Sequence, residues 1–292
     1  MSEPTEPTPQ AVARSGLDGW PAAVEPLAVP VFDAHTHLDA MAQRAGLDAS
    51  AEFVAAVMTA AASAGVARAI TVGDTVGASQ WCVAAAHQHA GVYAAVAVHP
   101  TEVAGLDEFG YAELERLAAD PRVVAVGETG LDYYWERTEP AAQQHHFRRH
   151  IDLAKRVGKP LMIHDRDAHA DVLRLLREEG APDLVVFHAF SGDAAMAREC
   201  VAAGYVLSFP GVVTFGNAPA LREAAALVPP EQLLVETDAP FLTPHPLRGR
   251  PNAPHLLPLT VRGLAAAAGH DLDELCAHIT ANGARIFGLP TE

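Results

Sequence analysis

Eight short apolar segments, separated by longer stretches of helical character, constrain the fold of this chain most strongly. Most of these segments are rich in Val, Ile and Leu without clean alternation of apolar and polar residues, which is typical of parallel strands buried on both faces. Their ends lie 22 to 39 residues apart, enough for one helix and two loops. The predicted strands are Val29–Asp33, Ala67–Val72, Val92–Val98, Val123–Gly127, Pro160–Ile163, Leu184–Phe187, Tyr205–Phe209 and Leu233–Glu236.

Eight strands alternating with helices over about 250 residues predict a single-domain α/β protein of the TIM-type (β/α)8 barrel class. An open doubly wound sheet is the alternative, but it would usually carry a glycine-rich phosphate loop after its first strand, and residues 32–37 contain no glycine. We expect residues 1–26 to form a loose arm and residues 27–292 to form the barrel. The predicted helices are Ala51–Ala64, Gly77–His89, Phe109–Ala119, Pro140–Val157, Ala168–Glu179, Asp193–Ala203, Asn217–Leu227, His255–Ala268 and Leu272–Phe287.

Composition excludes several classes of protein. Half of the 292 residues are hydrophobic, which is too many for a disordered chain, and the net charge of −16 argues against a protein that wraps DNA on a broad basic face. The three cysteines, Cys82, Cys200 and Cys276, lie far apart and form no disulfide framework or thiolate zinc motif. We therefore expect a cytoplasmic protein, with no membrane segment and no evident protein partner.

A pair of histidines follows the first predicted strand. His35 and His37 are two residues apart, so in an extended segment both imidazoles point the same way. In a barrel, side chains at the C-terminal ends of the strands face a common active-site mouth. His87 and His89 have the same spacing but end an Ala-rich helical stretch, and we interpret them as surface histidines.

Other predicted strands also end in polar residues, each after a short apolar run where an unpartnered polar group is costly. A closed parallel barrel would bring these ends together, so four imidazoles and two carboxylates are predicted to converge. The six residues are His35, His37, Glu128, His164, His188 and Asp238.

Six nitrogen and oxygen ligands without a thiolate suit one or two divalent cations such as Zn²⁺, Mn²⁺, Ni²⁺ or Mg²⁺. A pair of ions needs a bridging anion. We predict Glu128 as the bridge, because no lysine that could carry a bridging carbamate ends the fourth strand and Lys159 precedes the fifth. Asp238 is predicted to bind metal and to act as the general base.

Further polar residues near the strand ends are weaker candidates. His99, Arg166 and Arg248 are predicted substrate contacts, the arginines because a guanidinium matches a phosphate bidentately. Asp33 and Asp132 are predicted to orient ligand histidines. A further group of histidines lies on one predicted helix and is interpreted as a solvated face: His145, His146 and His150.

The segments around these residues resemble the TatD family of metal-dependent deoxyribonucleases, which belongs to the amidohydrolase-like barrels. The resemblance runs from about residue 28 to the C-terminus in the family's order, and the motifs are specific only in combination. They are FDAHTHLD at 32–39, GETGLDYY at 127–134, IHDRDA at 163–168, FHAFSG at 187–192, LVETDAPFL at 234–242 and RGRPNAP at 248–254.

This resemblance implies a TIM-type barrel that binds two divalent cations and hydrolyses DNA phosphodiesters, often from the 3′ end. It implies one metal site formed by His35, His37, Glu128 and Asp238, and a second formed by Glu128, His164 and His188. The chain departs from the family pattern at Thr101, Thr129 and Asp165, and none of these departures removes a ligand.

Two function hypotheses follow. The first is a metal-dependent deoxyribonuclease acting on DNA ends or on small phosphodiesters. The alternative is an amidohydrolase-type enzyme for a small-molecule amide, lactone or ester on the same barrel, since a fold does not determine a substrate. Low aromatic content and acidic charge make this alternative credible, because binding of single strands uses stacking aromatics. Tyr133, Tyr134, Trp135 and Phe241 are candidates to supply such rings next to the site. A metal-bound scaffold without activity is a third possibility, against which the complete ligand set argues.

Overall fold

The strands form the predicted barrel. In the computed structural model, which describes residues 17 and 19–290, eight parallel strands pair in chain order from β1 to β8. Every residue of β1, β3, β4, β6, β7 and β8 is buried, as the apolar segments predict. The strands are β1 (Val31–Thr36), β2 (Val66–Val72), β3 (Val92–Val96), β4 (Val123–Asp132), β5 (Leu161–Arg166), β6 (Val185–Phe187), β7 (Val206–Phe209) and β8 (Leu233–Val235).

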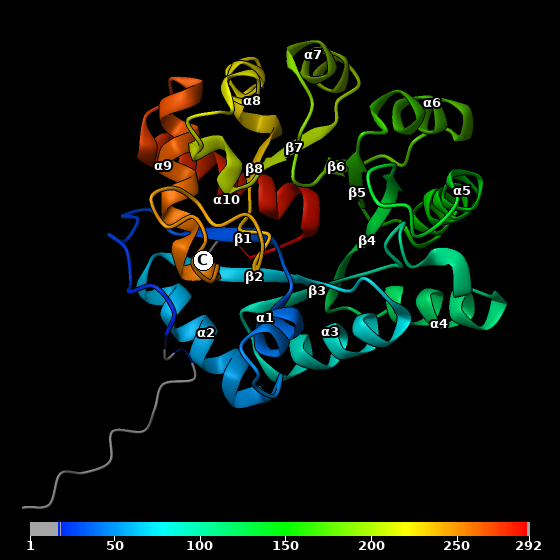
Figure 1. Cartoon of the computed structure of the whole chain (residues 1–292), viewed down its shortest axis with the longest axis horizontal. Helices are drawn as coiled ribbons and strands as arrows, with labels where there is room; N and C mark the ends of the chain where they lie inside the picture. The colour runs from blue at the N-terminus through cyan, green and yellow to red at the C-terminus, as the bar shows by residue number, and fades with distance from the viewer. Residues whose placement is uncertain (1–16, 18, 291–292) are drawn as a thin grey trace, which may run out of the picture.

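Helices surround the strands, as Figure 1 shows. Two of them begin at aspartate caps: Asp193 accepts hydrogen bonds from the first-turn amides of α7, and Asp271 does so for α10. The helices are α1 (Leu38–Arg44), α2 (Ala51–Ser63), α3 (Val76–Gln88), α4 (Glu108–Ala118), α5 (Pro140–Val157), α6 (His169–Glu179), α7 (Ala194–Ala202), α8 (Pro219–Ala225), α9 (Leu257–Ala268) and α10 (Leu272–Phe287). Among the described residues, no helix is both long and apolar enough to cross a bilayer.

The barrel closes between β1 and the chain just beyond β8. The Asp238 amide donates to the His35 carbonyl at 2.9 Å, and the His37 amide donates to the Ala239 carbonyl at 2.7 Å. A single parallel bridge joins Thr36 to Ala239. The backbone that carries two predicted histidine ligands is therefore bonded directly to the backbone that carries Asp238.

Several element boundaries differ from the predictions. Strands β1, β4 and β5 continue three to five residues beyond their expected ends, so that His35, Glu128 and His164 lie within strands. Helix α1 was not predicted. It is seven residues long and begins at His37 without a side-chain cap, so the sequence carries no helix start signal there.

The N-terminal arm is described only from Leu17 onward, without residue 18, and residues 1–16 lie outside the described part. The Trp20 ring packs against the core. The Pro21 carbonyl accepts a hydrogen bond from His255 at 3.0 Å, and the Glu25 and Pro26 carbonyls accept from Arg262. These contacts fasten the described end of the arm to α9 and the segment before it. The division of the chain near residue 26 stays a prediction.

The expectation of a solvated histidine face on α5 is wrong at His150, whose side chain is fully buried. Its Nδ1 donates to the His146 carbonyl at 2.9 Å, and its Nε2 accepts from the Val98 amide at 3.4 Å. Burial lowers the pKa of His150 to about 4. The apolar packing of α5 against β4 therefore encloses a neutral imidazole.

This burial predicts an acid-sensitive contribution to stability. Because the unfolded chain takes up a proton near pH 6.5 and folded His150 does so only near pH 4, the free energy of unfolding falls as the pH decreases through this window. Between pH 7 and pH 4 we expect the free energy of unfolding to fall by about 3 kcal/mol less in His150→Gln than in wild type.

The measurement is urea unfolding of wild type and variant at several pH values, with His145→Gln as the matched control, since His145 is exposed on the same helix. A difference between wild type and His150→Gln that stays constant with pH would contradict the assignment.

Candidate metal centre

The histidines of β1 and the carboxylate of β4 form one half of the site. The Nε2 atoms of His35 and His37 lie 3.2 Å apart. Glu128 Oε1 is 3.7 Å from the first of these nitrogens and 3.4 Å from the second. The side chains are buried, so the three groups face one another with little access for bulk water.

The second oxygen of the same carboxylate faces the other histidine pair. Glu128 Oε2 lies 3.3 Å from His164 Nδ1 and 2.8 Å from His188 Nε2. These two nitrogens are 3.4 Å apart. Glu128 thus stands between two imidazole pairs, with one oxygen directed to each pair.

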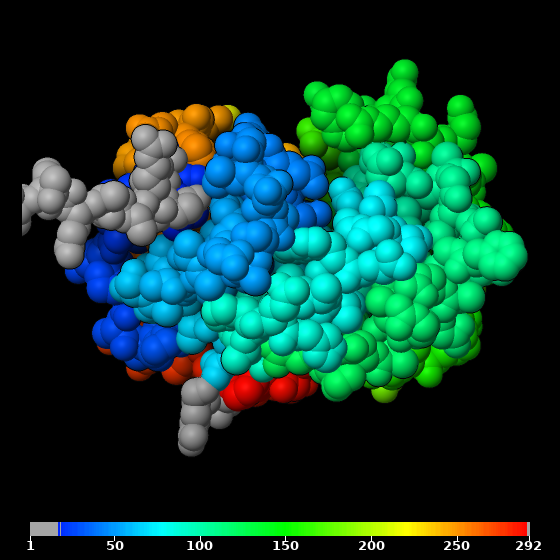
Figure 2. Space-filling model, turned by 90° about the horizontal axis from the view of Figure 1, so that it is seen from below, coloured from blue at the N-terminus to red at the C-terminus, as the bar shows by residue number. Residues whose placement is uncertain are grey.

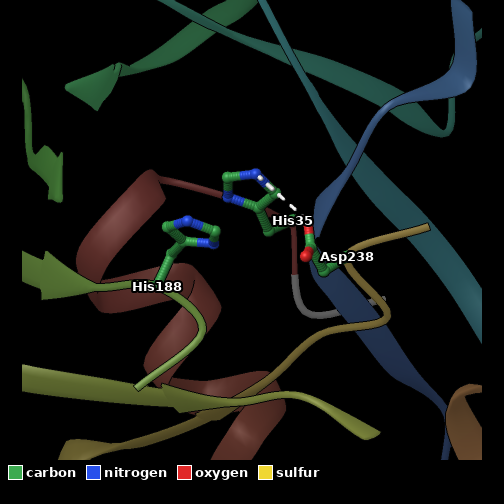
Figure 3. A group of neighbouring side chains, drawn as sticks. All are labelled: His35, His188 and Asp238. Carbon is green, nitrogen blue, oxygen red and sulfur yellow. Dashed lines mark ion pairs between the residues drawn. The ribbon is translucent and has the colours of Figure 1, made fainter. Parts of the chain in front are cut away.

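Asp238 completes the first half of the site. Its Oδ1 lies 3.5 Å from His37 Nε2 and 3.9 Å from His35 Nε2. Figure 3 shows this carboxylate beside His35, whose ring stacks on that of His188 with centroids 3.8 Å apart. Asp238 has a left-handed backbone conformation, with φ of 52°. Such a conformation is uncommon for a residue with a side chain, and it turns the carboxylate toward the β1 histidines.

The outer nitrogens of three histidines are held by acceptors. His37 Nδ1 donates to the Val72 carbonyl at 3.0 Å, and His164 Nε2 lies 2.9 Å from Asp132 Oδ2. His188 Nδ1 lies 3.3 Å from Glu236 Oε1. With the proton on the outer nitrogen, each inner nitrogen offers a lone pair to the centre, which is the arrangement of metal-ligating histidines.

The carboxylates govern the charge of the centre. Burial alone would raise the pKa of Glu128, but His188 and the hydrogen bonds from neighbouring imidazoles hold it well below its usual range. Burial opposes protonation of His37, yet Asp238 and Glu128 raise its pKa to about 9. The same carboxylates that attract protons here would attract cations, so metal binding is expected to release protons.

The donor set fits divalent cations. Two ligand atoms that each lie about 2.0–2.1 Å from one ion are about 3–3.5 Å apart, and the ligand atoms within each half of the site lie 2.8 to 3.9 Å apart. The groups of ligand atoms that lie within 4.8 Å of one another are His35–His37–Glu128, Glu128–His164–His188, His35–His188–Asp238 and His99–Asp132–His164. All six predicted ligands therefore converge, and their assignment to particular ions stays a prediction.

The two aspartates predicted to orient ligands take different positions. Asp132 contacts the His164 ring directly, whereas Asp33 contacts no imidazole. Asp33 accepts hydrogen bonds from the amide and hydroxyl of Thr237 and from the His35 amide. It thereby joins β1 to the chain after β8 and acts through the backbone. Burial raises the pKa of Asp33 to about 7.

The predicted substrate contacts lie around the centre. The His99 ring packs edge-on against that of His164 at 4.4 Å, and its Nδ1 accepts from the Thr101 amide. Burial and the nearby His164 lower the pKa of His99 to about 3. Arg166 and Arg248 are exposed, and neither makes an ion pair with a described residue. Their contact with substrate stays a prediction.

Glu236 is the residue that sequence reasoning missed. It is fully buried, and its Oε1 accepts from the Ala189 amide at 2.6 Å as well as facing His188. Glu236 lies two residues before Asp238 after the same strand, and this proximity could have indicated that it belongs to the site. In an extended strand an i, i+2 spacing would direct both carboxylates to one face, so the pair could have been considered together. The prediction that His87 is a surface residue agrees with the structure, where its side chain is half exposed and pairs with Asp120.

The centre lies at the C-terminal ends of the strands, where barrel enzymes place their active sites. Figure 2 shows an indentation in the upper outline of the molecule, between the blue part of the chain near α1 and α2 and the green part that follows β4. The chain segments that follow β1, β4 and β8 start at this end of the barrel, beside the ligands that these strands carry. We refer to the exposed surface at this end as the opening to the centre.

A family model described as TatD related DNase matches residues 32–288. The chain belongs to the TatD family. The chain is similar to an uncharacterized metal-dependent hydrolase of Mycobacterium tuberculosis named TatD. The two are 53% identical over 264 residues, which cover 89% of this chain and 98% of that protein. TatD-family membership and this set of converging ligands identify a metal-dependent hydrolase.

Two further TatD-family relatives span most of the chain. A protein of Erwinia amylovora named 3′-5′ ssDNA/RNA exonuclease TatD is 34% identical over 241 residues, covering 80% of this chain and 93% of that protein. The crystal structure of the TatD homologue YJJV of Escherichia coli superposes with a TM-score of 0.80 at 27% identity, covering 89% of this chain and 98% of that one. The barrel predicted from the spacing of the strands is thereby confirmed.

Proposed function

We propose that this chain is a deoxyribonuclease that removes nucleotides from the 3′ end of single-stranded DNA, using two divalent cations. The observation that carries the proposal is the position of Glu128, whose two oxygens each face one imidazole pair. A carboxylate placed in this way would hold two ions, and two-metal sites are typical of enzymes that cleave phosphodiesters.

In this proposal the ligands divide at Glu128. His35, His37, Glu128 and Asp238 would hold one ion, and Glu128, His164 and His188 would hold the other. Zn²⁺, Mn²⁺, Mg²⁺ and Ni²⁺ are all compatible with nitrogen and oxygen ligands. When bound, the ions would polarise the phosphoryl oxygens and lower the pKa of a water molecule.

Asp238 is suited to accept the proton of the attacking water. Its carboxylate is 12% exposed, compared with 5% for Glu128, so it is the carboxylate that water reaches more easily. Burial alone would raise the pKa of Asp238, but His37 and the other imidazoles lower it, which keeps the carboxylate ionised. As the new phosphorus–oxygen bond forms, one ester bond breaks and the water proton passes to Asp238.

The acidic chain can still bind an anion at this place. Two divalent ions and two carboxylates leave a formal charge of about +2 at the centre. Arg166 and Arg248, which make no ion pair within the described chain, can add hydrogen bonds to a phosphate. The Erwinia amylovora relative, named for exonuclease activity on single strands, supports this choice of substrate.

The experiment is an assay of the purified protein on 5′-labelled single-stranded DNA with Mg²⁺, Mn²⁺ or Zn²⁺, preceded by elemental analysis of the protein as isolated. We expect a ladder of products that shortens from the 3′ end and disappears when a chelator removes the metal. Turnover of an amide, lactone or ester panel by metal-loaded protein that leaves DNA intact would favour the small-molecule alternative.

We further propose the cytoplasm as the compartment, because Cys82, Cys200 and Cys276 are buried free thiols.

A further inference from the structure

Exposed aromatic side chains gather at the opening to the metal centre. Three of them lie on two loops: Tyr134 and Trp135 follow β4, and Phe241 follows β8. Their exposed fractions are 52%, 47% and 47%. Large aromatic rings normally bury their surface, and exposed ones that cluster beside a site mark a place of ligand contact. Phe109, on α4 in the outer ring of helices, is a further exposed aromatic residue.

The loop after β4 is tied directly to a candidate metal ligand. Asp132 Oδ1 accepts hydrogen bonds from the backbone amides of Tyr134 at 3.0 Å and Trp135 at 2.9 Å. The other oxygen of the same carboxylate holds His164 at 2.9 Å. The positions of the two aromatic residues are therefore set relative to the metal centre by one buried carboxylate.

The guanidinium of Arg166, which makes no ion pair with a described residue, lies beside these rings. The Arg166 guanidinium carbon lies 3.9 Å from the centroid of the Tyr134 ring and 6.0 Å from that of Trp135. A guanidinium stacked on an aromatic ring is a cation–π contact, and it leaves the edge of the guanidinium free to meet a phosphate. Rings and cation together present both the apolar face and the charge that a nucleotide needs.

A further exposed aromatic ring, that of Phe241, lies beside the β1 histidines. The Phe241 ring meets the His37 ring edge-on, with centroids 6.0 Å apart. Aromatic residues are thus linked to both halves of the centre: the Tyr134 and Trp135 backbone to His164 through Asp132, and the Phe241 ring to His37 directly. A strand whose phosphodiester reaches Glu128 would have its neighbouring bases beside these rings.

We propose that Trp135 forms a stacking platform for an unpaired base of the strand being cleaved, with the Tyr134 ring perpendicular to it at 5.0 Å and Arg166 on the face of Tyr134. In the same proposal Phe241 stacks on a second base, beside His37. The inference rests on the proposed nuclease function and assigns the residues that would contact the bases of its single-stranded substrate. Stacking requires a base face freed from its neighbours in a duplex, so paired ends are poor substrates until they fray. Stacking on a ring does not depend on the hydrogen-bonding groups of the base, so we expect the platform to accept any base.

The experiment combines removal of the ring with removal of the base. Two 5′-labelled single strands are compared, one normal and one in which the last three nucleosides at the 3′ end are abasic. Wild type, Trp135→Ala, Trp135→Phe and the control Phe109→Ala are assayed on both. We expect Trp135→Ala to lower kcat/KM about tenfold or more on the normal strand and less than about twofold on the abasic strand.

The remaining variants separate stacking from damage to the fold. Trp135→Phe keeps a ring and should retain most of the activity on the normal strand, and Phe109→Ala should match wild type on both. An equal loss on both strands in Trp135→Ala, or no loss on either, would overturn the platform.

Failure of the proposed function gives a different result. If wild type cleaves neither strand, the same comparisons are made as dissociation constants by fluorescence anisotropy. Base-dependent binding that Trp135→Ala abolishes would retain the platform and reject the nuclease. Binding that does not depend on the bases would reject the platform as well.

Discussion

Replacing Glu128 with glutamine is expected to lower phosphodiester hydrolysis at least about 1000-fold, a loss of about 4 kcal/mol of transition-state stabilisation. The substitution keeps the shape of the side chain but removes the charge that faces both imidazole pairs. It also leaves one half of the site facing an amide nitrogen, which is not a metal ligand. The measurements are kcat on labelled single-stranded DNA and metal content after dialysis, which we expect to fall together.

Glu136→Gln is the matched control for this prediction. Glu136 is exposed on the loop after β4, and its substitution changes the net charge by the same amount as Glu128→Gln. It should retain wild-type activity and metal content. A Glu128→Gln protein that binds two ions per chain and cleaves DNA within tenfold of wild type would show that this carboxylate is not the bridge.

The second large effect is expected at Asp238. Asp238→Asn should lower kcat by about 10²–10⁴-fold with little change in KM, because the amide keeps an oxygen near His37 but cannot accept a proton from water. Metal content should fall less than in Glu128→Gln, since Asp238 faces the histidines of one half of the site only.

Asp183→Asn, at an exposed position on the connection between α6 and β6, serves as the control and should match wild type. If Asp238→Asn instead loses both ions and unfolds at a lower temperature without them, Asp238 acts as a structural ligand and another group accepts the proton. If kcat stays within tenfold, Asp238 has neither function.

The order and positions of the strands could be predicted from local composition. Buried parallel strands are apolar over much of their length, and each of the eight predicted segments overlaps a strand. Their C-terminal boundaries could not be predicted in β1, β4 and β5, because the polar residues there resemble loop residues. They belong to strands since neighbouring backbone completes their hydrogen bonds, as the Asp132–Arg166 pairing between β4 and β5 illustrates.

The convergence of His35, Glu128, His188 and Asp238 also followed from the sequence, once the barrel was inferred. The sequence could not show which carboxylate contacts which histidine. Glu236 and Asp238 lie on the same strand end, yet the first holds the outer nitrogen of His188 and the second faces the β1 histidines. The left-handed backbone of Asp238 makes this difference, and a carboxylate in a sequence carries no sign of it.

Local sequence therefore determined the kinds of element, their order and the residue types at the strand ends, because periodicity and side-chain chemistry act over a few residues. Tertiary structure alone decided that Asp33 ties β1 to Thr237 rather than to an imidazole, and that His150 is enclosed while His145 on the same helix is exposed. Those outcomes depend on groups distant in the chain. Burial and hydrogen-bond partners exist only after the barrel has closed.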